Sequence, residues 1–183
     1  MRPRDESALG PLGEQQARRA GMHLSTDPPF ALDVCSPLLR ARQTADIIGA
    51  SIQLKPVVIP ELTEMTDREM TRVLLGEVVD RLLLGRGRVA RQAGEFLRAP
   101  LIGRVGQALA ALIAEHTESR VLMVAHGGVI WGVLTHLLPE QRRQFSRNRQ
   151  VANCSITRVS ILSNGARLIS LNETAHLGDL VTY

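Results

Sequence analysis

The feature that most constrains this chain is an apolar run that ends in a histidine and two glycines. Five consecutive apolar residues, 121–125, precede His126, Gly127 and Gly128. A run of this length, with polar residues before it and glycines after it, is typical of a strand buried on both faces of a parallel sheet. Residues 129–138 predict a helix that ends before a proline. We therefore expect His126 at the carboxyl end of a strand, just before a helix.

Two interpretations of His126 fit this position. Ligands of open parallel sheets bind at the carboxyl ends of strands, where free N–H groups and the helix dipole favour an anion. Glycines at 127 and 128 let such a ligand approach the backbone closely. On this interpretation His126 and Gly127 face a phosphate. The alternative is a histidine that only occupies the turn between strand and helix, and this stretch alone leaves both open.

Strands and helices are predicted to alternate along most of the chain. A helix is expected to begin at Ser36-Pro37, because serine is a preferred N-cap and proline a preferred first helical residue. The other predicted helices are 11–24, one that follows Pro100 and ends near His116, 129–138 and 140–146, and the predicted strands are 31–35, 57–59, 121–125, 155–162 and 167–171. Asn164-Gly165 between the last two strands predicts a hairpin turn. We expect one α/β domain, residues 1–183, built as a three-layer sandwich with a mainly parallel sheet and helices on both faces.

Residues 66–98 form a predicted helical excursion, broken at Gly85 and Gly87 and rich in arginine. It could be a lid over a site or a pair of solvated helices. For most of its arginines we favour the solvated pair.

Composition narrows the function classes. The 22 basic residues barely exceed the 18 acidic ones, and aromatic residues make up 3% of the chain, so nucleic-acid binding is disfavoured. No run approaches the roughly 18 apolar residues of a membrane span, and the first six residues lack the apolar core of a signal peptide. Cys35 and Cys154 are too few for a disulfide framework, so we expect both to be reduced and the protein to be cytoplasmic. The histidines and cysteines show no metal-ligand spacing.

Two further segments contain candidate site residues. Arg40 lies early in the helix that follows the 31–35 strand, where a cation opposes the helix dipole unless an anion is bound nearby. Glu64 follows the 57–59 strand and could give or take a proton in the same pocket. Taken alone, each is more simply a solvent-exposed charge; together with His126 they favour an anion site.

These segments resemble the histidine phosphatase superfamily, also called phosphoglycerate mutase-like. Residues 36–45 resemble its S-x-L-x-R-A-x-Q-T-A segment, and 121–130 resemble V-x-x-V-x-H-G-G-x-I. Supporting matches are 62–64 to its L-x-E acid segment, 93–96 with Arg104 to its G-G-E-S and following arginine, 9–17 to the start of its first helix, and 153–156 and 171–177 to its tail. The matches occur in the family's order.

The resemblance implies a phosphoglycerate mutase-like fold that hydrolyses or transfers phosphoryl groups without a metal or cofactor, through a phosphohistidine. The motif match assigns phosphate binding to Arg40 and His126, and proton donation to the leaving oxygen to Glu64. The ligand would be a small phosphorylated substrate or inorganic phosphate. These roles agree with the need for fixed cationic donors at phosphoryl oxygens and for an acid near the leaving group.

The family's L-x-R-H-G motif, which supplies the nucleophilic histidine, is absent from the printed sequence. It precedes the first-helix segment, but only eight residues precede Leu9, and neither Arg2 nor Arg4 is followed by His-Gly. His23 falls within a predicted helix. We therefore expect the first strand to be missing, which would leave a groove with unpaired backbone groups beside a neighbouring strand. Such an edge also favours association into a homodimer.

We expect a phosphomonoester hydrolase of the histidine phosphatase type that is inactive or strongly impaired as printed. Either the chain starts at an internal methionine of a longer, active protein, or it is a non-catalytic module that binds a phosphorylated ligand or a partner. We favour the first explanation because Arg40, Glu64 and His126 all remain. Mutase-type transfer is less favoured, since the chain is short and the 66–98 excursion compact.

Overall fold

Strands and helices alternate along the chain, as the sequence predicts. A computed structural model describes residues 7–82, 88–147 and 150–183. In chain order, and with η for a short 3-10 helix, the elements are α1 (Pro11–Leu24), β1 (Leu32–Cys35), α2 (Leu39–Ile52), β2 (Val57–Val58), η2 (Pro60–Leu62), α3 (Asp67–Leu82), α4 (Arg88–Glu115), β3 (Val121–Val124), α5 (Gly127–Leu137), η3 (Pro139–Gln141), α6 (Arg142–Arg147), β4 (Ile156–Leu162), β5 (Gly165–Glu173) and η4 (Ala175–Leu180).

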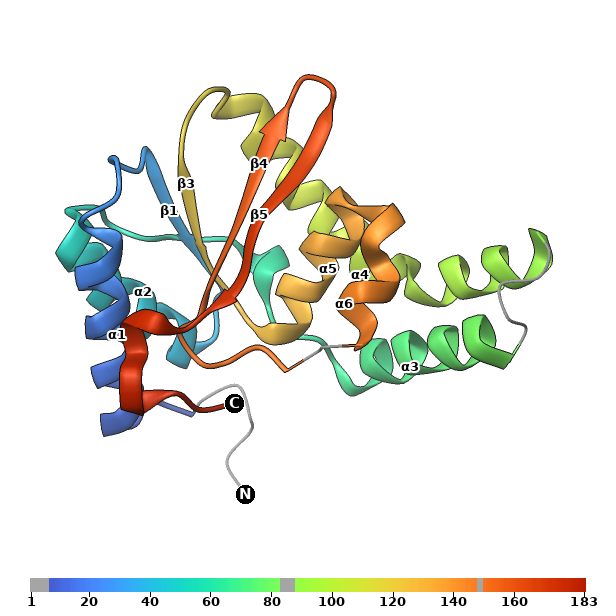
Figure 1. Ribbon diagram of the computed structural model, residues 1–183, viewed down its shortest axis with the longest axis horizontal. Coiled ribbons are helices and arrows are strands. Elements are labelled where there is room, and N and C mark those ends of the chain that lie inside the picture. Colours follow the sequence, from blue (N-terminus) through green and yellow to red (C-terminus); the bar gives the residue numbers. More distant parts are fainter. Residues whose placement is uncertain (1–6, 83–87, 148–149) are drawn as a thin grey trace.

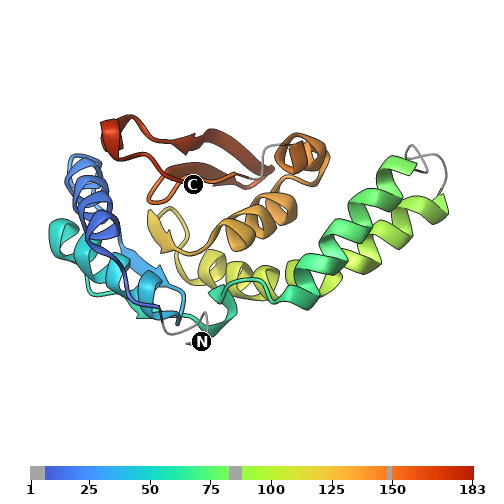
Figure 2. The same cartoon turned by 90° about the horizontal axis from the view of Figure 1, so that it is seen from below.

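The centre of the fold is a three-stranded parallel sheet in the order β2-β1-β3. β1 pairs with β3 over its whole length, so that Val34 lies opposite Met123 and Cys35 opposite Val124. Helices α1 and α2 lie on one side of this sheet, and α4 and α5 lie on the other (Figures 1 and 2). The predicted α/β architecture with helices on both faces is confirmed.

The last two strands form a separate antiparallel hairpin, β4-β5. Its turn contains Asn164-Gly165, and Gly165 has φ +134°, a conformation that glycine adopts readily. Val159 and Leu168 pack against the main apolar core, and Ile156 packs near Leu122 and Val124 of β3. The hairpin therefore covers part of the molecule near β3 without joining its sheet (Figure 1).

The edge of β3 that faces away from β1 is unpaired: within the described ranges, β3 has β1 as its only partner strand. All four β3 residues are partly exposed, whereas Val34 and Cys35 of β1 are buried. The prediction that 121–125 is buried on both faces is therefore wrong in degree. β1 has a partner strand on each edge, whereas within the described ranges β3 is an edge strand. The unpaired edge itself is the feature predicted for a chain without its first strand.

The 66–98 excursion is a helical hairpin made of α3 and the first half of α4, which projects from the body of the molecule (Figures 1 and 2). Its helical character is confirmed, and the predicted break at Gly85 and Gly87 lies outside the described residues. α4 continues through Pro100 instead of starting after it. Val73 is buried, whereas Leu74 and Val78 of α3 are exposed. A role as a lid stays a prediction.

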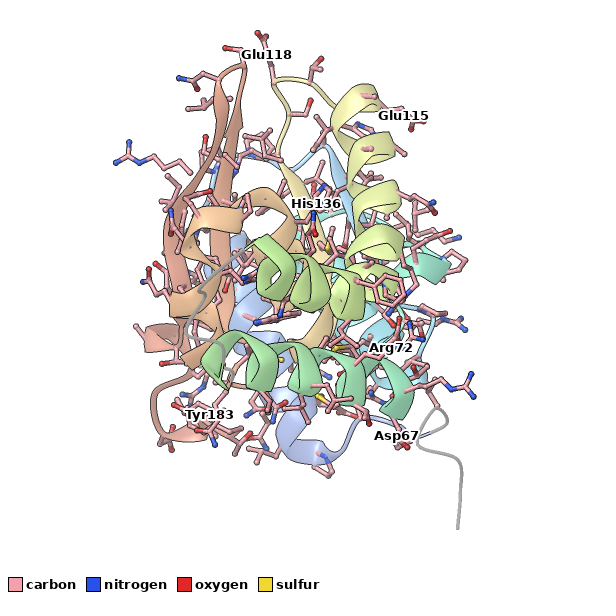
Figure 3. The ribbon with its side chains drawn as sticks, turned by 90° about the vertical axis from the view of Figure 1, so that its right-hand side faces the viewer. Asp67, Arg72, Glu115, Glu118, His136 and Tyr183 are labelled. Atoms are coloured by element: carbon pink, nitrogen blue, oxygen red, sulfur yellow. The ribbon has the colours of Figure 1, made fainter. Side chains whose placement is uncertain are left out.

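The main core lies between α4, α5 and the sheet. Leu101 and Val105 of α4 pack with Val129 and Leu134 of α5. Glycine at 106 lets the two helices approach closely, because a Cβ there would lie 2.8 Å from the ring of His136. His136 is labelled in Figure 3. The segment Phe96–Glu115 is apolar and long enough to cross a membrane, more so than the sequence predicts, and its Leu101, Val105 and Leu109 are buried in this core.

The end of the chain is fixed to its beginning. The buried Gln16 of α1 donates from Nε2 to the Leu180 carbonyl at 2.6 Å and to Thr182 Oγ1 at 2.8 Å. Arg19, one turn later, donates to the Leu177 carbonyl at 2.5 Å. The segment around η4 therefore covers the outer face of α1.

Candidate active site

Arg40 reaches the site because β1 ends directly before α2. It is the second residue of α2, and the first turn of that helix holds no acidic residue. The predicted start of the helix at Ser36-Pro37 is wrong: α2 begins at Leu39 with Leu38 as its N-cap. Ser36 lies before that N-cap, and its hydroxyl accepts a hydrogen bond from the Leu38 N–H at 3.3 Å and also bonds to a histidine that follows the neighbouring strand.

His126 follows β3 and is the N-cap residue of α5, at the strand end where the sequence predicts it. Its Nε2 lies 2.7 Å from Ser36 Oγ, and its Nδ1 lies 3.3 Å from Arg40 Nη2. Arginine can only donate, so Nδ1 is the acceptor and Nε2 carries the proton that it donates to Ser36. The ring is thereby oriented with Nδ1 toward the guanidinium.

The imidazole of His126 is neutral near pH 7. Burial disfavours the charged ring, and Arg40 adds repulsion, so that the pKa falls to about 4. A dianion bound beside Arg40 would oppose both effects and raise the pKa of His126.

Glu64 completes the cluster from a third element, the turn that follows η2. One of its oxygens accepts a hydrogen bond from the Met65 N–H at 2.8 Å, and the Gly128 N–H also donates to the carboxyl group. The other oxygen lies 3.8 Å from His126 Nδ1. The carboxylate thus lies at the amino terminus of α5, where free N–H groups and the helix dipole stabilise negative charge.

The acidity of Glu64 is set by opposing effects. Burial raises its pKa, while the two backbone donors and the charges of Arg40 and Arg104 lower it, and the net pKa is raised. A raised pKa favours the protonated acid, which is the form that can give a proton to a leaving oxygen.

The two glycines of the motif differ in role. A Cβ on Gly128 would lie 2.3 Å from the Met65 methyl and 2.8 Å from Glu64 Oε1, so both side chains would have to move to make room for it. A Cβ on Gly127 would meet only Val151, at 3.8 Å, an ordinary contact. Close approach to the backbone is therefore required at position 128, and the group that approaches is the protein's own acid segment.

Three of the predicted site residues thus converge: Arg40, His126 and Glu64, each from a different element, with Gly127 at the first position of α5. Sequence reasoning missed Ser36, which it assigned to a helix cap, and the contact of Glu64 with the Gly128 amide. The position of Ser36 directly after a strand, as for His126, was the available signal. Among the side chains that the structure describes, no group of three His, Cys, Asp or Glu residues is placed to hold a metal ion.

The sequence profile of the Histidine phosphatase superfamily (branch 1) matches residues 1–174. This chain belongs to that superfamily. Among its relatives, the probable phosphoglycerate mutase GpmB of Erwinia tasmaniensis is 30% identical over 188 residues, which cover 95% of this chain and 85% of the relative. The uncharacterized phosphatase PhoE of Bacillus subtilis is 25% identical, over 94% of this chain and 86% of the relative.

Solved structures share the fold of this superfamily member. Phosphoserine phosphatase from Entamoeba histolytica, in complex with 3-phosphoglyceric acid, superposes with a TM-score of 0.70 at 21% identity, over 97% of this chain and 90% of the other. Mycobacterial glucosyl-3-phosphoglycerate phosphatase, in complex with VO3, gives a TM-score of 0.68 at 24% identity, over 94% and 90% of the two chains. The predicted phosphoglycerate mutase-like fold is confirmed.

Proposed function

We propose that this site binds the phosphoryl group of a small phosphomonoester and belongs to a hydrolase that works through phosphohistidine. The observation that carries the proposal is the convergence of Arg40, His126 and Glu64 beside the amino terminus of α5. The Arg40 guanidinium and the amides at the start of α5 offer donors to phosphoryl oxygens, and His126 Nδ1 becomes a further donor when a bound dianion raises the pKa of the ring. Glu64 offers the proton that a leaving alkoxide needs.

The proposed reaction needs two functions, binding of the phosphoryl group and nucleophilic attack on it. The residues of this site serve the first. The second needs the R-H-G histidine, which the printed sequence does not contain. In the complete reaction a histidine nitrogen forms a bond to phosphorus while the bond to the leaving oxygen breaks, and Glu64 protonates that oxygen. Water then cleaves the phosphorus–nitrogen bond. Arg40 and His126 hold the phosphoryl oxygens throughout.

The ligands named for related structures support a small phosphorylated substrate. Relatives of the same fold are described in complex with phosphoserine, with 3-phosphoglyceric acid and with VO3. All three carry a phosphoryl group or an analogue of it.

One alternative has an observation in its favour. Because the R-H-G motif is absent from the printed sequence, the chain can also be a module that binds a phosphorylated ligand without turnover. Binding and turnover must therefore be measured separately.

Anion binding is best tested with sulfate, whose charge stays constant between pH 5 and 8, so that any pH dependence belongs to the protein. We expect calorimetry to show sulfate affinity rising as the pH falls, because protonation removes the competing negative charge of Glu64. Arg40→Gln should weaken binding roughly tenfold or more, since it removes charge-assisted hydrogen bonds. The control is Arg42→Gln on the exposed side of the same helix. Equal effects of the two variants, or no binding at any pH, would reject the proposed site.

Turnover separates the enzyme from the module. With an aryl phosphomonoester, we expect the printed chain to be at least about three decades slower than an intact relative, because loss of a hydrolase nucleophile costs up to about a millionfold. A longer protein that includes an R-H-G strand should form an acid-labile phosphohistidine. Robust turnover by the printed chain, abolished by His126→Ala, would show that another group has become the nucleophile.

A further inference from the structure

The segment that carries Glu64 is attached to α4 at both of its ends. Upstream, the Arg104 guanidinium donates from Nη1 to the Thr63 carbonyl at 2.9 Å and also to the Glu61 carbonyl. Downstream, Arg104 Nε lies 3.3 Å from Glu69 Oε1, in an ion pair whose side chains are mostly buried. Glu64 lies between these two attachment points.

The downstream attachment point is itself rigid. Thr66 and Glu69 form a reciprocal capping box at the start of α3: the Thr66 N–H donates to Glu69 Oε2 at 2.8 Å, and the Glu69 N–H donates to Thr66 Oγ1 at 3.2 Å. The same carboxylate therefore serves the cap and Arg104. Upstream, Leu62 is fully buried in the core. Only residues 63–65 separate the core anchor from the cap.

We propose that Arg104 is a positioning residue for the acid of this site: its planar fork fixes the segment 61–69 so that Glu64 faces His126 and the Gly128 amide. Arg104 reaches the site through Glu64 and not through the ligand. Met65 of this segment packs directly on the backbone of Gly128, because its methyl lies 2.3 Å from where a Cβ on Gly128 would be. A shift of the segment would remove the acid from the α5 amino terminus.

The guanidinium also influences the acid electrostatically. The charge of Arg104 lowers the pKa of Glu64 against the larger effect of burial. Removing Arg104 should therefore raise the pKa of Glu64 further, as well as loosening its segment. A purely structural arginine would alter stability and leave both properties unchanged.

The test uses the ligand-free 183-residue chain, so that it does not depend on the phosphoryl-binding proposal beyond the role given to Glu64. Two NMR readouts are followed: the carboxyl titration of Glu64 and the nuclear Overhauser contact between the Met65 methyl and the Gly128 α-protons. Arg104→Gln is expected to move the titration to higher pH and to abolish most of the contact. Arg104→Lys should keep the titration near that of the native chain but weaken the contact, because lysine has the charge without the fork.

Arg120→Gln is the matched control. Arg120 also pairs with a carbonyl and a carboxylate, those of Pro28 and Asp27, but it precedes β3 and so lies at the opposite end of that strand from His126. It should move neither readout. If Arg104→Gln does not fold, Glu69→Gln replaces it: glutamine keeps the capping box and removes the ion pair, and a weakened contact is still expected.

An unchanged Met65–Gly128 contact and an unchanged Glu64 titration in a folded Arg104→Gln chain would overturn the proposal. So would equal shifts in Arg120→Gln. Sulfate binding measured on the same samples reports separately on the proposed function. Loss of the contact and a raised titration in Arg104→Gln, together with no sulfate binding by the native chain, would support the positioning role and reject that function.

Discussion

β1 and β3 are adjacent parallel strands that both lead into site residues, yet they differ in sequence and in their surroundings. β1 is paired on both edges, with β2 and β3, and its Val34 is 0% exposed. β3 is paired on one edge within the described chain, and Met123, opposite Val34, is partly exposed. The more apolar strand is thus the less buried one. Burial here depends on the number of neighbouring strands and not on the apolarity of the run.

The two strands also bring opposite kinds of titratable group into the interior. Asp33 in β1 is fully buried, and neither of its side-chain oxygens has a hydrogen-bond partner among the residues that the structure describes. Burial, with a smaller contribution from Asp46, raises the pKa of Asp33 to about 7. His126 after β3 has its pKa lowered to about 4. Between about pH 4 and 6.5 both groups are neutral in the folded chain, whereas in the unfolded chain each would be charged. Because one is an acid and the other a base, they change the unfolding free energy with pH in opposite directions.

The largest expected effect comes from Asp33→Asn. Below pH 3.8, the pKa in the unfolded chain, the Asp33 carboxyl is protonated in both the folded and the unfolded state. Between pH 3.8 and 7 only the unfolded state ionises. The unfolding free energy of the native chain therefore decreases by up to about 4 kcal/mol across this range. The asparagine variant should therefore gain stability relative to the native chain as the pH rises from 4 to 7. Urea unfolding across that range measures the difference. Asp179→Asn, at an exposed site, is the control, and parallel profiles for both variants would contradict the burial argument.

His126→Gln should have the opposite sign and a slightly smaller size. Above pH 6.5 the ring is neutral in both states; between 6.5 and 4 the unfolded state gains a proton that the folded state does not, so the native chain loses about 3 kcal/mol as the pH falls. The glutamine variant lacks this loss. As the pH rises from 4 to 6.5, the native chain regains this contribution to its unfolding free energy and the variant does not. The unfolding free energy of the native chain should therefore increase by about 3 kcal/mol relative to that of the variant. A native-like slope would show that His126 is not held neutral.

Alanine substitutions at the paired positions Val34 and Met123 compare the strands directly. Val34→Ala should cost about 2–3 kcal/mol, because it opens a cavity in a fully buried site. Met123→Ala removes a larger side chain but should cost only about 1 kcal/mol, since part of that side chain already contacts water. Urea unfolding at one pH is sufficient. A greater loss at Met123 would mean that the free edge of β3 is covered in solution.

The smallest effect concerns individual amides. Alternate N–H groups of a strand point to opposite edges, so in β3 about half should exchange rapidly with solvent while the others are protected by β1. Hydrogen exchange followed by NMR would show alternating protection in β3 and more uniform protection at Val34 and Cys35. Uniform protection across β3 would indicate that a second copy or another strand covers the edge.

Local patterns were sufficient to predict most elements. The bounds of α1 match the prediction, the Asn164-Gly165 turn defines the last hairpin, and the order of strands and helices gives the α/β class. The site was predictable to the extent that its residues follow strands, because parallel strands bring their carboxyl ends to one edge.

Features that depend on tertiary neighbours were not predictable. Ser36 carries an N-cap signature, but its hydroxyl bonds to His126, 90 residues away in sequence. The pattern around Arg104 gave a family match but no partner, because its contacts lie 35 to 43 residues upstream. The half-burial of β3 depends on a neighbour that no local window contains.

The hydrogen bonds from Gln16 and Arg19 to the segment around η4 have a consequence for biosynthesis. During synthesis α1 leaves the ribosome well before the carbonyls of Leu177 and Leu180, which lie 158 residues beyond Arg19 and 164 residues beyond Gln16. Until then the polar side chain of Gln16 must stay hydrated, and α1 cannot settle permanently. Completion of the contacts of α1 is thereby tied to synthesis of the segment around η4.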